Sequence, residues 1–276
     1  VDTLRYVQPN SGSRTYPCKS NYISVAIRDS GEVMTKATAL DEVVNYFDPM
    51  KALKDEYLER YYVERESPAA NFEQHILLKK DAKFLLSGHM GSGKSTELQK
   101  IYKNFQERED YLAIYLDAME ILDTNNIDYA DILFAISAAI YKYSVEKGIK
   151  FDQRLENELD SFTEEVTKEV EERTEMGLGA KLNVLFFDGG GRYSKESTVR
   201  KKIRERIQPK TTRLLTLINN LIGEVRSNGY SVVVIVDSLD HAPHADDIYL
   251  NYGRILTDIN CAVIYTVPIE FLYTPQ

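Results

Sequence analysis

The chain has 276 residues, of which 43% are hydrophobic and 28% charged, and its formal net charge is -9. This composition is that of an ordinary globular protein, and it excludes a collagen-like, rod-like or wholly disordered chain. The acidic balance does not favour nucleic acid as a partner. Cys18 and Cys261 form no metal-binding spacing, so we interpret them as reduced thiols of a cytoplasmic protein. The longest strongly apolar run, residues 232–236, is too short for a membrane span, and no membrane association is expected.

Helices and strands are expected to alternate in the first half of the chain. Residues 1–38 lack periodicity and suggest an arm of loops and short strands, whereas 40–62 and 67–78 repeat apolar residues at helical spacing, with a break at Asp48-Pro49. There follow a buried strand at 83–87, a helix at 94–107, a strand at 111–117 and an apolar helix at 129–145. This order favours a parallel sheet with crossover helices.

The pattern changes between residues 150 and 210. We expect an acidic helix at 152–175 that ends at Gly177 and Gly179, a strand at 181–187, a glycine turn at 189–191 and a basic stretch at 200–213. This segment is interpreted as a helical and β-hairpin insertion in the core. The alternating pattern then resumes with a helix at 211–226, a strand at 231–237, a helix at 247–258 and a last strand at 261–267.

The most informative segment follows the strand at 83–87. It fits the phosphate-binding pattern of Gly, four residues and Gly-Lys-Ser, and it comprises Gly88, His89, Met90, Gly91, Ser92, Gly93, Lys94 and Ser95. Glycines let the backbone N–H groups turn toward phosphate oxygens, next to the positive end of the following helix. Lys94 is expected to reach the β- and γ-phosphates and Ser95 to bind Mg²⁺. Thr96 is expected to support the helix start beside the nucleotide.

A second group of polar residues follows the strand at 231–237. Asp237 ends this strand, where a carboxylate can hold Mg²⁺ directly or through water. Asp240 is the candidate for orienting the attacking water, with a surface carboxylate as the alternative. Thr266, near the end of the last strand, is a candidate for contact with the γ-phosphate, or else it satisfies backbone groups. His241 and His244 are weaker candidates, since two histidines without a third ligand more often lie in a solvated loop.

These segments resemble the additional-strand P-loop ATPases and, within them, the STAND group related to the AAA+ proteins. The resemblance rests on residues 88–98, 232–240 and 261–269, and the linker 61–65 is similar to one that contacts adenine in such proteins. It implies a three-layer α/β P-loop NTPase fold with a mainly parallel central sheet. It divides the chain into an N-terminal arm with helices (1–60), a core in two parts (61–149 and 211–276) and the insertion (150–210).

The chain departs from the family pattern in two places. Ser238 stands where a catalytic Glu would directly follow Asp237, which favours slow turnover. The chain also ends after the fourth strand that we can assign, so we expect a fragment that lacks a lid and C-terminal domains, or else an N-terminal strand that completes the sheet.

The resemblance implies ATP or ADP binding with Mg²⁺, slow hydrolysis, nucleotide-controlled self-association or partner binding, and a role in bacterial signalling or defence. Two alternatives stay open: a P-loop kinase and a nucleotide-stabilised scaffold without catalysis. The basic stretch 200–213 is interpreted first as a solvated helix face, with an intersubunit arginine finger and phosphate-backbone binding as alternatives.

Overall fold

The computed structural model describes residues 52–63, 68–122, 124–168, 177–188, 197–243 and 245–273. The expected arm at 1–38, most of the helical stretch at 40–62, the glycine turn at 189–191 and His244 lie outside these residues. Within them, no helix combines the length and apolar character that crossing a membrane requires.

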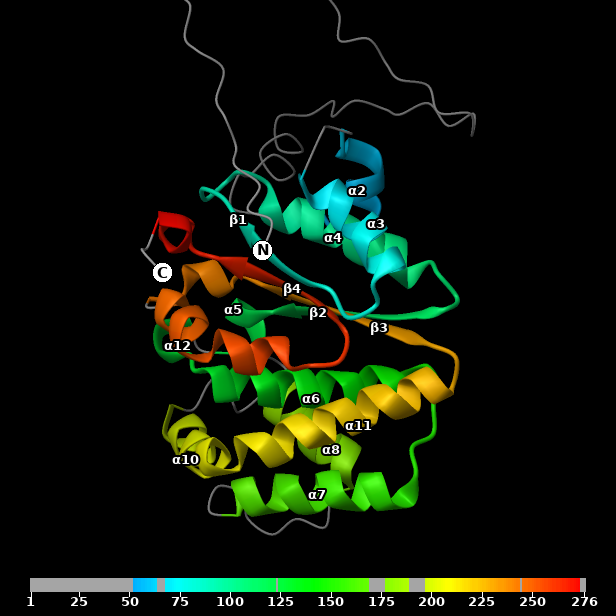
Figure 1. Ribbon diagram of the computed structural model, residues 1–276, viewed down its shortest axis with the longest axis vertical. Helices are drawn as coiled ribbons and strands as arrows, with labels where there is room; N and C mark the ends of the chain where they lie inside the picture. Colours follow the sequence, from blue (N-terminus) through cyan, green and yellow to red (C-terminus); the bar gives the residue numbers. More distant parts are fainter. Residues whose placement is uncertain are drawn as a thin grey trace, which may run out of the picture.

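Four parallel strands form the central sheet in the order β1-β4-β3-β2 (Figure 1). They span Lys83–Ser87 (β1), Tyr111–Asp117 (β2), Ser231–Asp237 (β3) and Ala262–Val267 (β4), as the apolar runs predict. Every residue of β3 and β4 is buried, which explains why these strands are almost continuously apolar and rich in Val and Ile. β4 therefore separates the strand before the glycine-rich loop from the strand that ends at Asp237.

Helices cover both faces of the sheet (Figure 1). One face carries α2 (Asp55–Tyr61), α3 (Pro68–Leu78) and α4 (Lys94–Gln106). The other face carries α6 (Tyr129–Glu146), α11 (Thr211–Ser227) and α12 (Ala245–Thr257). Alternate residues of β3 contribute to the two hydrophobic clusters on either side: Val233 and Ile235 to one, Val232, Val234 and Val236 to the other.

A further layer of helices packs outside α6 and α11 (Figure 1). It consists of α7 (Gln153–Thr167), α8 (Leu178–Leu182), a π-helical turn η2 (Asn183–Phe187), α10 (Ser197–Ile207) and a 3₁₀ turn η4 (Gln208–Lys210). Its apolar residues join the same hydrophobic cluster as α6, α11 and one face of the sheet. This segment is therefore continuous with the main core.

The expected strand at 181–187 is wrong, and so is its role as one arm of a β-hairpin. These residues are helical, in α8 and η2. The physical reason is the spacing of the apolar residues, which recur at i, i+4, i+7 and i+8: Leu178, Leu182, Leu185 and Phe186. All four are buried, and the Phe186 ring packs edge-on against Phe134 of α6. Gly177 precedes α8 as its N-cap residue and does not end the acidic helix.

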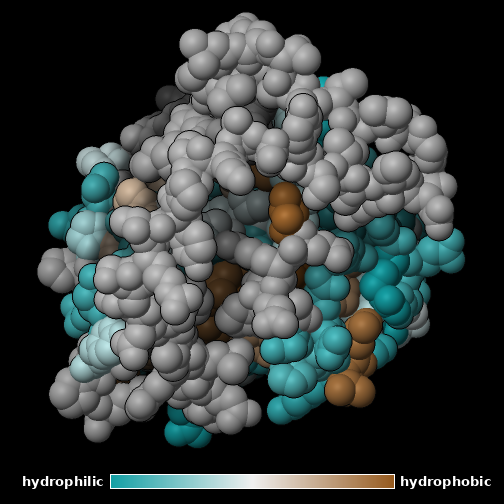
Figure 2. All heavy atoms as spheres, turned by 90° about the horizontal axis from the view of Figure 1, so that it is seen from above, coloured by the Kyte–Doolittle hydropathy of each residue, from teal (hydrophilic) through white to brown (hydrophobic). Residues whose placement is uncertain are grey.

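The expectation of a fully buried strand at 83–87 is also wrong. Within the described residues β1 pairs only with β4, so it is an edge strand, and Leu85 is 42% exposed. Exposed apolar side chains also occur nearby in sequence, at Val63, Leu77 and Leu78. On the face drawn in Figure 2, hydrophobic side chains of the coloured residues are seen as separate spots among hydrophilic ones.

Short helices complete the described chain. They are α5 (Ala118–Ile121), η1 (Thr124–Asn126), η5 (Leu239–His241) and η6 (Ile269–Tyr273). α5 directly follows β2 and η5 follows β3 after one residue, so both begin at the carboxyl edge of the sheet, where the glycine-rich loop also leaves β1. This edge is where open α/β sheets bind their ligands.

Candidate functional site

The loop between β1 and α4 has the backbone conformation that its glycines predict. Gly91 and Gly93 have φ values of 74° and 88°, in the left-handed region that side chains disfavour. A Cβ added to Gly88 would lie 2.9 Å from the Ser92 hydroxyl oxygen, so a larger residue here would require the Ser92 side chain to move. Gly93 is the N-cap residue of α4, and the backbone N–H groups of the first turn therefore begin directly after the loop.

Lys94 is held by three oxygen acceptors of the chain. Its Nζ donates to the carbonyl oxygens of Gly88 at 2.7 Å and His89 at 3.2 Å, and it lies 3.0 Å from Oδ2 of Asp240. The Lys94 and Asp240 side chains are only 9% and 10% exposed. The other carboxylate oxygen of Asp240, Oδ1, is buried without a hydrogen-bond partner among the described residues. The structure thus brings together the phosphate-binding lysine and the residue expected to orient water.

Asp237 is buried at the end of β3, with 1% exposure. Its Oδ2 accepts a hydrogen bond from the Tyr115 hydroxyl at 2.5 Å, and its Oδ1 accepts one from the backbone N–H of Ser238 at 2.7 Å. Burial raises the pKa of Asp237, and the polar groups of Tyr115, Ser95 and Ser238 oppose that rise. Ser95, the other predicted Mg²⁺ ligand, is therefore near enough to Asp237 to affect its charge.

A tight turn after β3 brings Asp240 to Lys94. Ser238 has a φ of 64°, which is uncommon for a residue with a side chain and reverses the chain directly after Asp237. The next N–H, that of Leu239, donates to the Thr266 hydroxyl at 2.9 Å. Thr266 is fully buried, and its carbonyl oxygen accepts a hydrogen bond from Tyr249. In this structure Thr266 supports the turn that carries Asp240.

A small pocket of about 70 Å³ lies beside the loop. Its lining includes Met90, Gly91, Gly93, Lys94, Ser95 and Thr96 from the loop and the start of α4, together with Ala52 and His241. His241, which the sequence analysis placed in a solvated loop, is exposed and borders this pocket. A larger, open hollow between α7 and α11 contains none of the predicted site residues.

The segment before the core contacts the start of α4. The backbone N–H of Leu53 donates to the Thr96 hydroxyl at 3.3 Å. The Tyr62 hydroxyl donates to both oxygens of the buried Glu97 carboxylate, at 3.2 and 3.1 Å. Residues 52–62 are thus attached to the helix that begins at the phosphate loop.

The donor set at this site fits Mg²⁺. The Ser95 hydroxyl and the Asp237 carboxylate supply hard oxygen atoms, and Mg²⁺ commonly takes one or two such protein groups together with phosphate oxygens and water. Within the described residues, no cluster of three or more His, Cys, Asp or Glu side chains could hold a metal by itself.

Three side chains at the site were missed by the sequence analysis: Tyr115, Gln99 and Glu97. In the sequence Tyr115 is an aromatic residue of a predicted strand, and the local pattern does not indicate that its hydroxyl has a polar partner. The available signal was indirect, because a strand next to β3 in the sheet has to present side chains beside Asp237.

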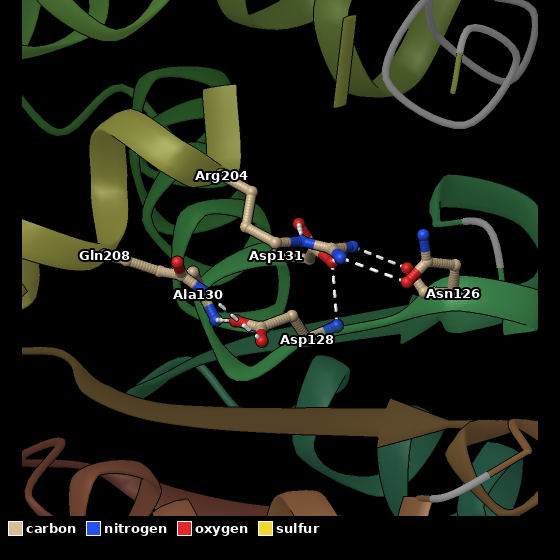
Figure 3. A network of polar contacts seen from close by, with 6 residues as sticks. All are labelled: Asn126, Asp128, Ala130, Asp131, Arg204 and Gln208. Carbon is tan, nitrogen blue, oxygen red and sulfur yellow. Dashed lines mark hydrogen bonds and ion pairs between the residues drawn. The ribbon is translucent and has the colours of Figure 1, made fainter. Parts of the chain in front are cut away.

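Several side chains of the basic stretch 200–213 form hydrogen bonds and ion pairs with other residues of the chain. Arg204 of α10 binds the fully buried Asp131 of α6 through two of its nitrogens (Figure 3). The rest of this network consists of Asn126, Asp128, Ala130 and Gln208. Lys210 and Arg213 both pair with Glu165 of α7. These contacts favour a structural role for most of the stretch.

A parallel α/β sheet whose first strand leads through a Gly-Lys-Ser loop into a helix defines a P-loop NTPase domain. A comparison with protein-family models finds the KAP family P-loop domain over residues 66–252, which is more than half of the chain. The chain belongs to this family, and membership implies nucleotide binding. The matched region includes the loop, Asp237 and Asp240. No curated protein matches the chain.

Proposed function

We propose that this protein binds ATP together with Mg²⁺ and hydrolyses it slowly as a nucleotide-controlled switch. The observation that carries the proposal is the ion pair between Lys94 and Asp240, at 3.0 Å. The β- and γ-phosphates of ATP need the same ammonium group that Asp240 occupies. Nucleotide binding therefore requires a different arrangement of Lys94 and Asp240, and the site has two states that nucleotide can select.

The phosphates would be bound by the loop from Gly88 to Ser95. Backbone N–H groups of the loop and the positive end of α4, a helix of 13 residues, favour anions at this point. Ser95 and Asp237 would hold Mg²⁺, which when bound neutralises phosphate charge. Thr96 and Ala52 border the same pocket, and His241 faces the loop across it.

Hydrolysis would use the Asp240 carboxylate after it separates from Lys94. A water molecule held by Asp240 would attack the γ-phosphorus, and the bond to the β–γ bridging oxygen would break to release ADP and phosphate. Ser238 occupies the place of a catalytic Glu next to Asp237, and its own side chain cannot act as a base of that kind. Turnover is therefore expected to be slow.

The position of β4 between β1 and β3 supports the additional-strand group of P-loop ATPases. The finer assignment to a STAND-like or AAA+-related protein, with cytoplasmic location, self-association or partner binding and a role in signalling or defence, rests on the sequence resemblance. The chain division at 61–149, 150–210 and 211–276 belongs to the same proposal.

The test is nucleotide binding by the wild-type protein and by Lys94→Ala, measured by calorimetry with ATP and Mg²⁺. The variant is expected to lose detectable binding, because Lys94 is the one Lys or Arg among the described residues that line the pocket. Lys103→Ala is a matched control, since Lys103 lies on the same helix but pairs with Glu59 outside the pocket. Normal ATP binding by Lys94→Ala would refute the site.

Phosphate release separates the catalytic alternatives. The proposal expects slow release that needs no second substrate. A rate that rises only with an added acceptor would indicate a kinase, and firmly retained nucleotide without any release would indicate a scaffold.

A further inference from the structure

The Tyr115 hydroxyl lies between α4 and the end of β3. It donates to Oδ2 of Asp237 at 2.5 Å, within the range of hydrogen bonds from a hydroxyl to a carboxylate. Because an ionised carboxylate can only accept, the Tyr115 proton is directed at Asp237. The Gln99 side chain of α4 opposes the rise that burial gives the pKa of Tyr115, which places a polar group on α4 near the same hydroxyl.

This contact fixes the orientation of the Asp237 carboxylate. A carboxylate on a strand can rotate about its Cβ–Cγ bond, so its lone pairs have no set direction unless both oxygens are bonded. In this structure Tyr115 bonds Oδ2 and the Ser238 N–H bonds Oδ1. Both bonds are independent of Ser95, the other predicted Mg²⁺ ligand. Tyr115 and Ser238 would therefore still hold the carboxylate in place if Ser95 bound a metal.

Packing holds the Tyr115 ring as well. β2 and β3 are in parallel register, with Tyr115 opposite Ile235 and Asp117 opposite Asp237. The Tyr115 ring also contacts the Tyr102 ring of α4, with 5.6 Å between their centroids. The hydroxyl is therefore positioned by a strand and a neighbouring aromatic ring.

We infer that Tyr115 is a positioning residue for the metal–nucleotide site, because its hydroxyl holds the Asp237 carboxylate in the orientation that receives Mg²⁺ or a Mg²⁺-bound water. This inference rests on the proposed function. Tyr115 acts through Asp237 and does not itself contact nucleotide. Hydrogen-bonding partners of metal-binding residues commonly change metal affinity by about 10- to 100-fold when they are removed.

The test removes only the hydroxyl, in Tyr115→Phe. Mn²⁺ replaces Mg²⁺ as a paramagnetic probe, and its binding to the protein with a non-hydrolysable ATP analogue is followed by electron paramagnetic resonance. We expect the Mn²⁺ dissociation constant to rise by about tenfold. Analogue binding in EDTA should stay close to wild type, since a fault in folding would change it. The thermal unfolding midpoint should fall by only a few degrees, because a single hydrogen bond to a buried carboxylate is lost.

Tyr102→Phe is the matched control, because it removes a hydroxyl from the ring that packs against Tyr115. It should leave the Mn²⁺ dissociation constant unchanged. The effect of Tyr115→Phe should also vanish in an Asp237→Asn background, where the carboxylate that Tyr115 orients is absent. Should Tyr115→Phe not fold, Gln99→Met serves instead, since it removes the polar side chain that affects the charge of the Tyr115 hydroxyl. A smaller rise in the same constant is expected, and no rise would overturn the inference.

The outcomes separate the two proposals. If the wild-type protein binds the analogue with Mn²⁺ and Tyr115→Phe shows the same dissociation constant, the role of Tyr115 is overturned and the proposed function stands. An equal shift in the Asp237→Asn background would also overturn it. If the wild-type protein shows no metal-dependent binding, the proposed function fails and this inference fails with it.

Discussion

The ammonium group of Lys94 and the carboxylate of Asp240 form an ion pair at 3.0 Å, although the two residues lie on different sides of the site. Lys94 begins α4, and Asp240 lies in the turn after β3. Both side chains are about 90% buried, so water screens their attraction less than at a surface. Under the proposed function, the lysine that would bind phosphate and the carboxylate that would orient water restrain each other until an anion separates them.

Replacing Asp240 by Asn should separate binding from hydrolysis. The amide cannot neutralise Lys94, so we expect ATP affinity to rise several-fold, because the phosphates no longer compete with a carboxylate. Hydrolysis should fall by about 100-fold, within the usual contribution of a general base. Calorimetry and phosphate release measure the two effects. Asp246→Asn, at the start of α12, makes the same charge change as a control, and reduced ATP affinity in Asp240→Asn would contradict the ion-pair argument.

Thr266→Val should reduce turnover while ATP binding persists. Valine has nearly the same shape but leaves the buried N–H of Leu239 without an acceptor, which costs about 1–3 kcal/mol of folding free energy. The turn that holds Asp240 then loses its support. Urea unfolding and phosphate release test this. Thr257→Val is the control, since Thr257 is exposed at the end of α12, and the argument fails if both variants behave alike.

Arg204→Ala should destabilise the protein by about 3–5 kcal/mol, because it breaks an ion pair with the buried Asp131 carboxylate. Arg213→Ala breaks an exposed pair and should cost no more than about 1 kcal/mol. Denaturant unfolding compares them. Phosphate release per folded molecule should not change in either variant. A large loss of turnover with normal stability would instead favour the arginine-finger interpretation.

Cys261 should be unreactive in the folded protein. Burial raises the pKa of its thiol to about 12, so at pH 8 only about one molecule in ten thousand carries the reactive thiolate. In a Cys18→Ser variant, a thiol reagent at pH 8 should label the native protein very slowly and the denatured protein at once. Rapid labelling of the native variant would show that β4 opens readily.

The sequence predicts local structure well where one period dominates. The strand at 231–237 matches the structure residue for residue, because a run of Val and Ile ending in Asp suits only a buried strand at this position. The segment 181–187 was wrongly predicted as a strand because its closely spaced apolar residues are compatible with both a strand and a helix. Packing against α6 stabilises the helix. Gly91 and Gly93 could be predicted as loop residues from the motif. Their left-handed backbone angles disfavour other residue types, which is why the motif contains glycine there.

Contacts between distant segments could not be predicted in this way. The Lys94–Asp240 pair depends on the left-handed turn at Ser238, and the Tyr115–Asp237 bond depends on β2 lying next to β3. The local sequence pattern specifies neither the order of the strands in the sheet nor the direction in which a side chain points. The residue types of the site were therefore predictable, whereas the partners that hold them in place were not.

The position of β4 also constrains how the protein is made. β4 is the last of the four strands in the chain, yet it pairs on one side with β1 and on the other with β3. β1 can join the rest of the sheet only after β4 has formed, because Lys83 of β1 pairs with Val263 of β4. During synthesis on the ribosome, the phosphate loop would emerge well before the strand that joins β1 to β3. If the protein binds ATP as proposed, the nucleotide should therefore stabilise the chain only after β4 has been made and inserted.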